Sequence, residues 1–257
     1  LTLIASAGTT LGEIQHVLDS AEQWLPIDPP RAPESTVGGV VAVGQSGPLR
    51  TRYGLPRDFV LGMTLMRPDG ELVRAGGRVV KNVTGYDLML LWTGSLGTLG
   101  IITEVAFKVL PKPETVNLGY DFPDYASLFA AANTLLANDV RPYILDALLV
   151  HEGRWSTFIR IDAASEKTVR DLLGHGGIKS SDSDSYPMLR DFGAWQEPPL
   201  SLRISSVPSK LETVIGRLRS LQDTVTMVAR PLAGQARACW MTAPSRAAFQ
   251  LVLDGLR

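Results

Sequence analysis

Three glycines spaced three residues apart constrain this chain most, because backbone without side chains at such spacing either turns tightly or lets another group approach closely. The Leu- and Met-rich segment 86–92 before them favours a short helix, and the β-branched segment 101–110 after them favours a strand. A dinucleotide-binding βαβ unit has the opposite order, a strand, then glycines, then a helix, and is therefore excluded for this loop. The glycines are Gly94, Gly97 and Gly100.

Length and charge exclude several classes of protein. A chain of 257 residues can form one large domain or two modest ones, and its net charge of −1 offers no electrostatic footprint for nucleic acid. No apolar run approaches the roughly 18 residues that a membrane-spanning helix needs. Cys239, the one cysteine, cannot form an internal disulfide and is predicted to be a buried strand residue in a protein of a reducing compartment.

The first part of the chain contains a strand, a helix and a hairpin. Residues 1–8 favour a strand, and Thr10 and Glu13 have the spacing of a helix capping box. The following helix presents one apolar face, with His16 away from it. Residues 59–77 predict a hairpin that turns at 68–70. The apolar face consists of Leu11, Ile14, Leu18 and Ala21.

Between these elements, the four prolines of residues 26–34 predict an extended, stiff connection. Residues 35–47 follow it, and their apolar run allows either a strand or a helix.

After Pro111 the pattern changes to a repeated order of elements. A strand, a helix, two strands and a second helix are predicted within residues 115–174, and the same order returns within residues 200–255. We therefore expect an α+β fold with one domain at 1–113 and a second, internally duplicated domain at 114–257. The predicted segments are 115–122, 124–138, 143–150, 155–162 and 165–174, then 200–206, 208–221, 224–230, 236–242 and 244–255.

Two glycine-bearing segments of the first domain, 36–39 and 94–102, could present bare backbone N–H groups to a phosphate or pyrophosphate. If 37–43 is helical, Gly38 and Gly39 lie in its first turn, where unpaired N–H groups favour an anion. Tight turns and close packing are the alternative for any single glycine. Because two such segments occur in one domain, binding of an anion is the favoured interpretation.

Longer motifs carry a resemblance to a known family. The segments STVGGVVAVGQSGPLRTRYG and GYDLMLLWTGSLGTLGIITE resemble the vanillyl-alcohol-oxidase, PCMH-type FAD-binding family, and within it the E subunits of bacterial glycolate oxidases. The resemblance covers residues 1–113, and the duplicated second part is similar to that family's cap domain. It implies part of a PCMH-type FAD-binding domain, whose N-terminal part would precede residue 1, followed by a ferredoxin-like β-α-β-β-α cap.

The resemblance also implies which residues contact a non-covalent FAD. Around the pyrophosphate it places Pro30, Ser35, Thr36, Val37, Gly38 and Gly39, and on the approach to the flavin ring Ala42, Gly47, Arg50 and Gly54. Close to the cofactor it places Gly97, Thr98 and Gly100, and at the adenine end the backbone of Ile101 and Ile102. Lys81 and Tyr86 match the KN-x-x-GYD segment, where a lysine could meet a diphosphate or flavin oxygen or lie on the surface.

No catalytic residue or metal site is predicted. The three histidines, His16, His151 and His175, are far apart and lack ligand spacing. Three arginines in or beside cap strands could hold a carboxylate, with surface charges as the alternative. These are Arg141, Arg160 and Arg203.

The function implied by the resemblance is that of an FAD-binding subunit of a 2-hydroxy-acid (glycolate) oxidase complex, an oxidoreductase that converts glycolate to glyoxylate. Its partners would be a second, catalytic FAD-containing subunit and an iron–sulfur subunit. It would lie in the cytoplasm and reach the inner membrane only through the complex. The alternatives are a non-catalytic assembly subunit of that complex and a free-standing FAD-dependent oxidase of another hydroxy acid such as D-lactate.

Overall fold

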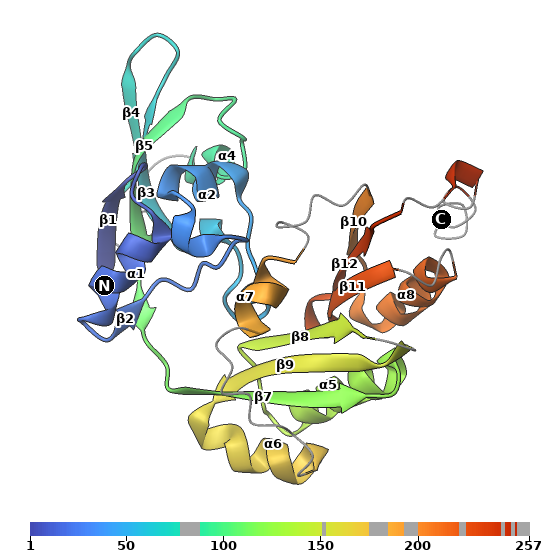
Figure 1. Ribbon diagram of the computed structural model, residues 1–257. Coiled ribbons are helices and arrows are strands. Elements are labelled where there is room, and N and C mark those ends of the chain that lie inside the picture. The colour runs from blue at the N-terminus through green and yellow to red at the C-terminus, as the bar shows by residue number, and fades with distance from the viewer. Residues whose placement is uncertain are drawn as a thin grey trace. The chain divides into compact units, whose positions relative to one another are not determined.

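The computed structural model describes residues 1–77, 88–150, 153–174, 185–192, 200–220, 225–242, 245–247 and 250. The chain forms two compact units, Leu1–Pro113 and Glu114–Arg257, which run from blue to green and from green to red in Figure 1. Each unit encloses its own hydrophobic core.

An antiparallel sheet of four strands, in the order β1-β5-β3-β4, is the framework of the first unit. Its β3–β4 hairpin turns through 67–71, where the Arg67 N–H donates to the Glu71 carbonyl over 2.9 Å, and the predicted hairpin is thereby confirmed. The strands are β1 (Thr2–Ser6), β3 (Val60–Met66), β4 (Leu72–Gly76) and β5 (Ile101–Lys108).

Helix α1 (Leu11–Asp19) begins at the predicted capping box, in which the Thr10 hydroxyl accepts from the Glu13 N–H and the Glu13 carboxylate accepts from the Thr10 N–H. Its apolar positions at the helical spacing of three and four are buried against the sheet, and His16 is exposed, as predicted. The prediction for Ala21 is wrong, because the helix ends at Asp19 and Ala21 is exposed.

Helix α2 (Val37–Val43) settles the segment whose pattern allowed either a helix or a strand. Val37, Val40 and Val41 are buried in the same core as Phe107 of β5, so one face of the helix packs on the sheet. In Figure 1, α1 and α2 lie side by side. The expectation of a wholly extended segment at 26–34 is wrong at its end, where residues 32–34 form the short helix η1 (Ala32–Glu34).

Short elements complete the first unit. Strand β2 pairs with β6 in a two-stranded ribbon, and α4 precedes the glycine loop as the pattern of 86–92 predicted. Helix α3 is a single turn that was not predicted. These elements are β2 (Gln23–Trp24), α3 (Arg50–Tyr53), η2 (Pro56–Asp58), α4 (Leu88–Trp92) and β6 (Leu110–Pro111).

The second unit contains a six-stranded antiparallel sheet in the order β10-β12-β11-β8-β9-β7. Its first half consists of β7 (Thr115–Phe122), α5 (Tyr125–Ala137), β8 (Ile144–Leu149), β9 (Trp155–Asp162), η4 (Ala163–Ser165) and α6 (Glu166–Leu173). Its second half consists of β10 (Leu200–Ser205), η5 (Pro208–Lys210), α8 (Leu211–Arg219), β11 (Val225–Arg230), η6 (Pro231–Ala233) and β12 (Gln235–Trp240).

The two halves repeat the order strand, helix, strand, strand, and each places its first strand at an edge of the sheet. They meet at a seam between β8 and β11, where Leu148 lies opposite Val228 and Ala147 opposite Ala229. Helix α7 (Ser185–Arg190), which was not predicted, lies in the chain between the halves. Most of the helix predicted at 244–255 lies outside the described residues.

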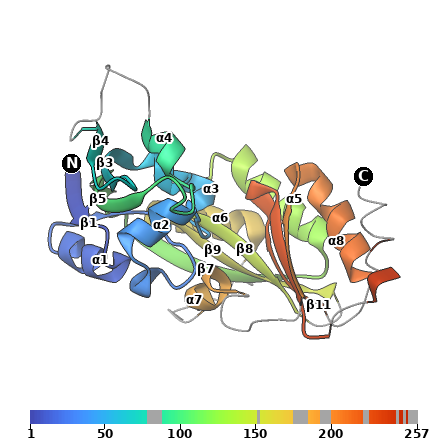
Figure 2. The same cartoon turned by 90° about the horizontal axis from the view of Figure 1, so that it is seen from above.

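Helices α5 and α8 cover one face of this sheet (Figure 2). Large apolar side chains such as Leu128, Leu211 and Trp240 fill that interface. Because each strand alternates between the two faces, the opposite face carries the charged side chains of Asp146, Arg160 and Arg230 together with apolar ones such as Ile144 and Phe158. Cys239 is buried in β12 with a free thiol, as predicted.

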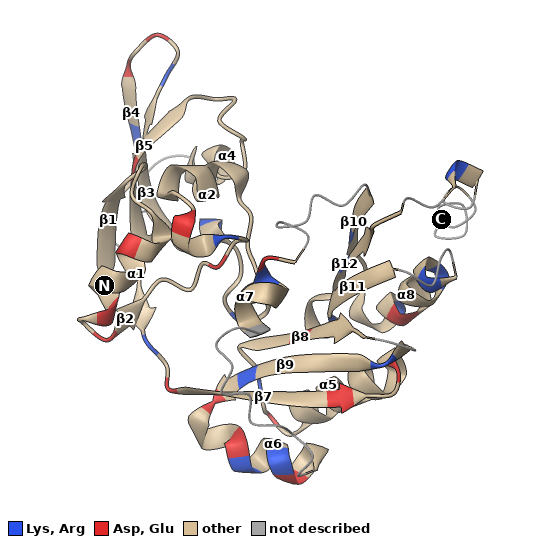
Figure 3. Ribbon diagram, viewed as in Figure 1, with Lys and Arg blue, Asp and Glu red and all other residues tan. Residues whose placement is uncertain are grey.

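Charges of both signs occur in each unit (Figure 3). No helix among the described residues is long and apolar enough to cross a membrane. Within the same residues, no group of three His, Cys, Asp or Glu side chains is placed to hold a metal ion.

Candidate cofactor-binding site

The loop at residues 93–100 joins α4 to β5 and has an unusual backbone. Gly94, Leu96, Gly97 and Gly100 have φ angles of +83°, +56°, +74° and +149°. A leucine in the left-handed region costs about 1–2 kcal/mol, so its surroundings must impose that conformation. Such positions cluster where a protein holds a ligand.

The C-terminal end of α2 holds this loop in place. The N–H groups of Gly94 and Leu96 donate to the carbonyls of Val41 and Ala42 over 2.9 and 2.8 Å. These carbonyls belong to the last turn of α2, where carbonyl groups lack an N–H donor within the helix. A Cβ on Gly44, the C-cap of α2, would lie 3.2 Å from the Gly94 Cα. Two of the glycines therefore serve to bring helix and loop together.

Two glycines of the loop, Gly94 and Gly97, border open space. A Cβ on Gly94 or Gly97 would meet no atom within 4 Å, and the stretch from Leu96 to Leu99 is exposed. Within the part of the chain that the structure describes, the N–H groups of Gly97 and Leu99 donate to no carbonyl. Unpaired N–H groups in an exposed loop can bind a phosphate or carbonyl oxygen, so the loop fits a contact with FAD.

Gly100 closes the loop onto β3. A Cβ at this position would lie 2.6 Å from the Met66 carbonyl oxygen, so only glycine fits without a backbone shift. Beyond it, Ile101 is 61% exposed whereas Ile102 is 8% exposed. Of these two predicted contact residues, Ile101 is the one that presents its side chain at the surface.

The N-terminal end of α2 corrects the predicted role of its glycines. The N–H groups of Val37 and Gly38 donate to the carbonyls of Thr9 and Ala7 over 2.9 and 2.8 Å, so these two donors are already used. A Cβ on Gly38 would lie 2.8 Å from the Ala7 Cβ. The expectation that Gly38 offers a free N–H group to an anion is therefore wrong, and its missing side chain serves close packing.

Gly39 and Thr36 differ from Gly38 in exposure. Both are exposed, and the Gly39 N–H donates to the Thr36 hydroxyl over 3.4 Å, a long hydrogen bond. A Cβ on Gly39 would meet only that hydroxyl oxygen, at 3.1 Å. Because the glycine loop contacts the C-terminal end of α2, the two predicted glycine segments lie at opposite ends of one helix.

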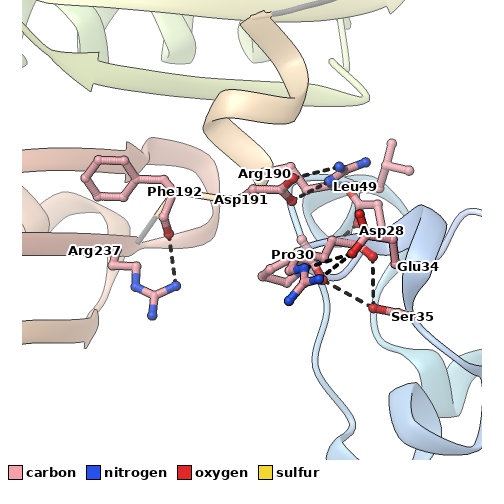
Figure 4. Close-up of polar contacts among 11 residues, drawn as sticks. Asp28, Pro30, Glu34, Ser35, Leu49, Arg190, Asp191, Phe192 and Arg237 are labelled. Carbon is pink, nitrogen blue, oxygen red and sulfur yellow. Dashed lines mark hydrogen bonds and ion pairs between the residues drawn. The ribbon is translucent and has the colours of Figure 1, made fainter. Parts of the chain in front are cut away.

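A buried carboxylate that the sequence analysis missed shapes the neighbouring segment. Asp28 is 5% exposed, and its two carboxylate oxygens accept from the N–H groups of Gly47 and Leu49 over 3.2 and 3.0 Å (Figure 4). A Cβ on Gly47 would lie 1.9 Å from the Asp28 carbonyl oxygen. The one signal in the sequence is an acidic residue among prolines, which does not reveal a partner nineteen residues away.

Gly54 has a similar structural reason. Its φ is +88°, and a Cβ would lie 2.4 Å from the Asp58 carboxylate, which accepts from the Leu55 N–H over 2.7 Å. Gly47 and Gly54 thus fix the course of the backbone on either side of α3, which carries the exposed Arg50. Among the described residues, Arg50 forms no ion pair, so its guanidinium is available to an anion.

The remaining predicted contacts are less available or lie elsewhere. The Ser35 hydroxyl donates to the carbonyls of Arg31 and Pro30 over 3.0 and 3.4 Å (Figure 4). Lys81 and Tyr86 lie outside the described residues. His151 and His175 do as well, so His16 on α1 is the described histidine.

Comparison with known proteins identifies a family that the first unit matches. Residues 1–76 match the family described as FAD binding domain. The chain is 39% identical over 178 residues to glycolate oxidase subunit GlcE of Escherichia coli K12, which covers 68% of this chain and 49% of that protein. It is 35% identical over 151 residues to glycolate oxidase subunit GlcD of Bacillus subtilis. This match covers 58% of this chain and 32% of that protein.

A D-lactate dehydrogenase of Anaerostipes hadrus is 46% identical over 111 residues, which cover 43% of this chain and 23% of that enzyme. The chain therefore spans about half or less of the length of these relatives. The solved structure of an alkyldihydroxyacetonephosphate synthase superposes with a TM-score of 0.73 at 17% identity and covers 98% of this chain and 58% of that one.

This superposition confirms the expected fold class. The alignments extend from the FAD binding domain into the second unit, since 178 matched residues exceed the 113 residues of the first. The glycine loop lies in the first unit, and its residues Gly97 and Leu99 are exposed. The chain thus belongs to the FAD-binding family of oxidoreductases that includes glycolate oxidase subunits and D-lactate dehydrogenases, and its cofactor is FAD.

Proposed function

We propose that this chain acts as an FAD-binding subunit of a 2-hydroxy-acid oxidase complex that converts glycolate to glyoxylate. The observation that carries the proposal is the glycine loop, in which Gly97 and Leu99 are exposed and, among the described residues, donate their N–H groups to no carbonyl. The loop lies in the same compact unit as residues 1–76, which match the FAD binding domain. The similarity to a glycolate oxidase subunit favours glycolate as the substrate.

Bound FAD would supply the two-electron acceptor for the oxidation of the α-carbon. The described residues of this chain would hold it: the N–H groups of Gly97 and Leu99 donate to oxygen atoms, and Arg50 supplies a positive charge. The bare surface at Gly94 and Gly97 leaves room for a flat group. We propose that this chain binds FAD non-covalently.

Partner subunits complete the chemistry in this proposal. Oxidation of a hydroxy acid needs a base for the hydroxyl proton, and the histidine that the structure describes, His16, is exposed on α1. An iron–sulfur cluster usually needs four thiolates, whereas this chain has Cys239 alone. We therefore propose a second, catalytic flavoprotein and an iron–sulfur protein as partners, and contact with the inner membrane only through them.

The FAD contact is tested with two glycines that have a similar backbone conformation and lie in different loops. Gly97 and Gly70 have φ angles of +74° and +85°, and a Cβ on either would meet no atom within 4 Å. Leucine should therefore cost similar folding stability at both positions. We expect Gly97→Leu to weaken FAD binding about tenfold or more, measured by quenching of flavin fluorescence, and Gly70→Leu in the β3–β4 turn to leave it unchanged. Equal effects of the two variants on FAD binding would show that the loop does not contact FAD.

The activity is tested by glycolate-dependent dye reduction with added FAD. We expect turnover by the chain reconstituted with a GlcD-type flavoprotein and an iron–sulfur subunit, and none by the chain alone. Comparable rates in the two samples would make it a free-standing enzyme. The similarity to a D-lactate dehydrogenase favours D-lactate as the second substrate to test in that case. Flavin absent from both the chain and the complex-bound subunit would leave assembly as its role.

A further inference from the structure

The face of the second unit's sheet that α5 and α8 leave uncovered carries several arginines. On β10, Leu200, Leu202 and Ile204 pack into the helix-covered core, so Ser201 and Arg203 point to the opposite face. The register of β10 with β12 places Ser201 opposite Cys239 and Arg203 opposite Arg237. Residues directly opposite on antiparallel strands share a face, so all four side chains emerge together.

The first half of the sheet shows how such an arginine is normally satisfied. Arg160 on β9, the middle strand of that half, lies opposite Asn117 on β7 and donates to the Asn117 side-chain oxygen over 2.9 Å. Its guanidinium carbon also lies 4.6 Å from the centre of the Tyr186 ring. A neutral acceptor and an aromatic ring therefore accompany this charge.

The second half repeats the arginine, but the residue directly opposite it is a second arginine rather than an asparagine. Arg237 on β12, the middle strand of that half, has a second arginine, Arg203, directly opposite on β10. Side chains so placed have Cβ atoms about 4.5–5.5 Å apart, and like charges at that distance destabilise the pair. Within the described ranges, neither arginine forms an ion pair, whereas Arg230 on the same face is paired with Asp146.

The Arg237 guanidinium is held in one orientation. Its Nε donates to the Ser201 hydroxyl over 3.2 Å, and one Nη donates to the Phe192 carbonyl over 3.0 Å (Figure 4). Among the described residues, its second Nη has no hydrogen-bond partner. The Ser201 oxygen also lies 3.6 Å from the Cys239 sulfur, which donates to it, so the hydroxyl proton of Ser201 is left for another acceptor.

We propose that Arg203, Arg237 and Ser201 form a binding site for a small oxyanion, a carboxylate or a phosphate group. The cluster presents donors from all three side chains and two positive charges, and planar guanidinium groups bind either oxyanion through paired hydrogen bonds. Arg203 and Ser201 are exposed, so an anion can reach them. This inference goes beyond the proposed function and does not require FAD.

The test measures anion binding to the whole chain without FAD, by calorimetric titration with oxalate and, separately, with inorganic phosphate at constant ionic strength. We expect saturable binding of one anion per chain, about tenfold weaker in Arg203→Gln and in Arg237→Gln. Tighter binding of oxalate assigns the site to a carboxylate, and tighter binding of phosphate assigns it to a phosphate group. Because arginine stays charged, oxalate binding should not change between about pH 6 and 9.

Arg141→Gln is the matched control, because Arg141 is an exposed arginine of the same unit that is paired with Asp139 over 3.3 Å. This variant removes the same charge away from the cluster and should bind as the wild type does. Among the described residues, Arg203 forms no hydrogen bond or ion pair that its replacement would break, so its variant reports on binding even if Arg237→Gln unfolds. Absence of saturable binding, or an equal loss in Arg141→Gln, would overturn the proposal.

Discussion

Replacement of Arg230 by methionine would leave a buried carboxylate without its counter-charge. Asp146 on β8 is 0% exposed, and an ion pair joins its Oδ2 to the Arg230 Nε at 3.0 Å. Its other oxygen, Oδ1, has no hydrogen-bond partner among the described residues. Removal of one member of a buried pair typically costs about 3–5 kcal/mol, which for a unit of this size lowers Tm on the order of 10 °C.

The dependence of this loss on pH follows from the pKa of Asp146. Burial raises the pKa of Asp146, and the charge of Arg230 opposes that rise. A carboxyl whose pKa is raised by folding is stabilising below its unfolded pKa, and that stability is lost as the pH rises through the folded pKa. Without Arg230 the pKa rises further, so the difference in Tm between variant and wild type should widen toward neutral pH and narrow as the pH falls.

Calorimetric unfolding of the whole chain at several pH values measures this difference. Arg203→Met is the control, since Arg203 lies exposed on the same sheet face, and we expect a change within about 0.5 kcal/mol. The double variant Asp146→Leu, Arg230→Met should recover most of the loss, because it removes both charges. A loss under about 1 kcal/mol at pH 7, or a loss equal at every pH, would refute the reasoning.

Three further predictions concern the first unit, and each is checked by denaturant or thermal unfolding. Gly47→Ala should destabilise more than Gly97→Ala, because a Cβ at 47 would lie 1.9 Å from a backbone oxygen, whereas alanine at 97 costs about 1–2 kcal/mol for its positive φ alone; the reverse order would contradict this. Leu96→Gly should raise stability by up to about 1 kcal/mol, since φ is +56° and the side chain is 70% exposed; a lower Tm would count against it. Lys112 donates to Asp19 over 2.7 Å and so lowers the pKa of Asp19. The stability that this interaction contributes is present above the unfolded pKa of the aspartate and is lost as the pH falls through the folded pKa. Lys112→Met should therefore cost under about 1 kcal/mol at pH 7 and nothing near pH 2.

Elements with strong local signals could be predicted from the sequence. The strands at 115–122 and 155–162 occur with the predicted bounds, because β-branched and aromatic residues alternate between turn signals. The capping box of α1 is likewise a local pattern of two residues. The class of the segment 37–43 could not be predicted, because its apolar residues suit both periods and only packing on Phe107 and its neighbours decides.

The roles of the glycines could not be predicted either, since they depend on partners far away in the chain. Gly38 is bare because Ala7 lies against it, and Gly47 is bare because Asp28 does. A motif marks such positions without distinguishing close packing from an open surface. The glycine loop separates the two cases, because Gly100 packs on β3 while Gly97 faces open space.

The seam between β8 and β11 sets an order of events in folding. The β8–β9 and β11–β12 hairpins pair residues close in sequence, such as Leu149 with Trp155, whereas the seam pairs Leu148 with Val228. Contacts between distant residues form more slowly, because a longer loop must be closed before they stabilise the chain. We therefore expect each half to fold around its own hairpin and the seam to close last. Substitutions at the seam should then mainly accelerate unfolding and leave the folding rate almost unchanged.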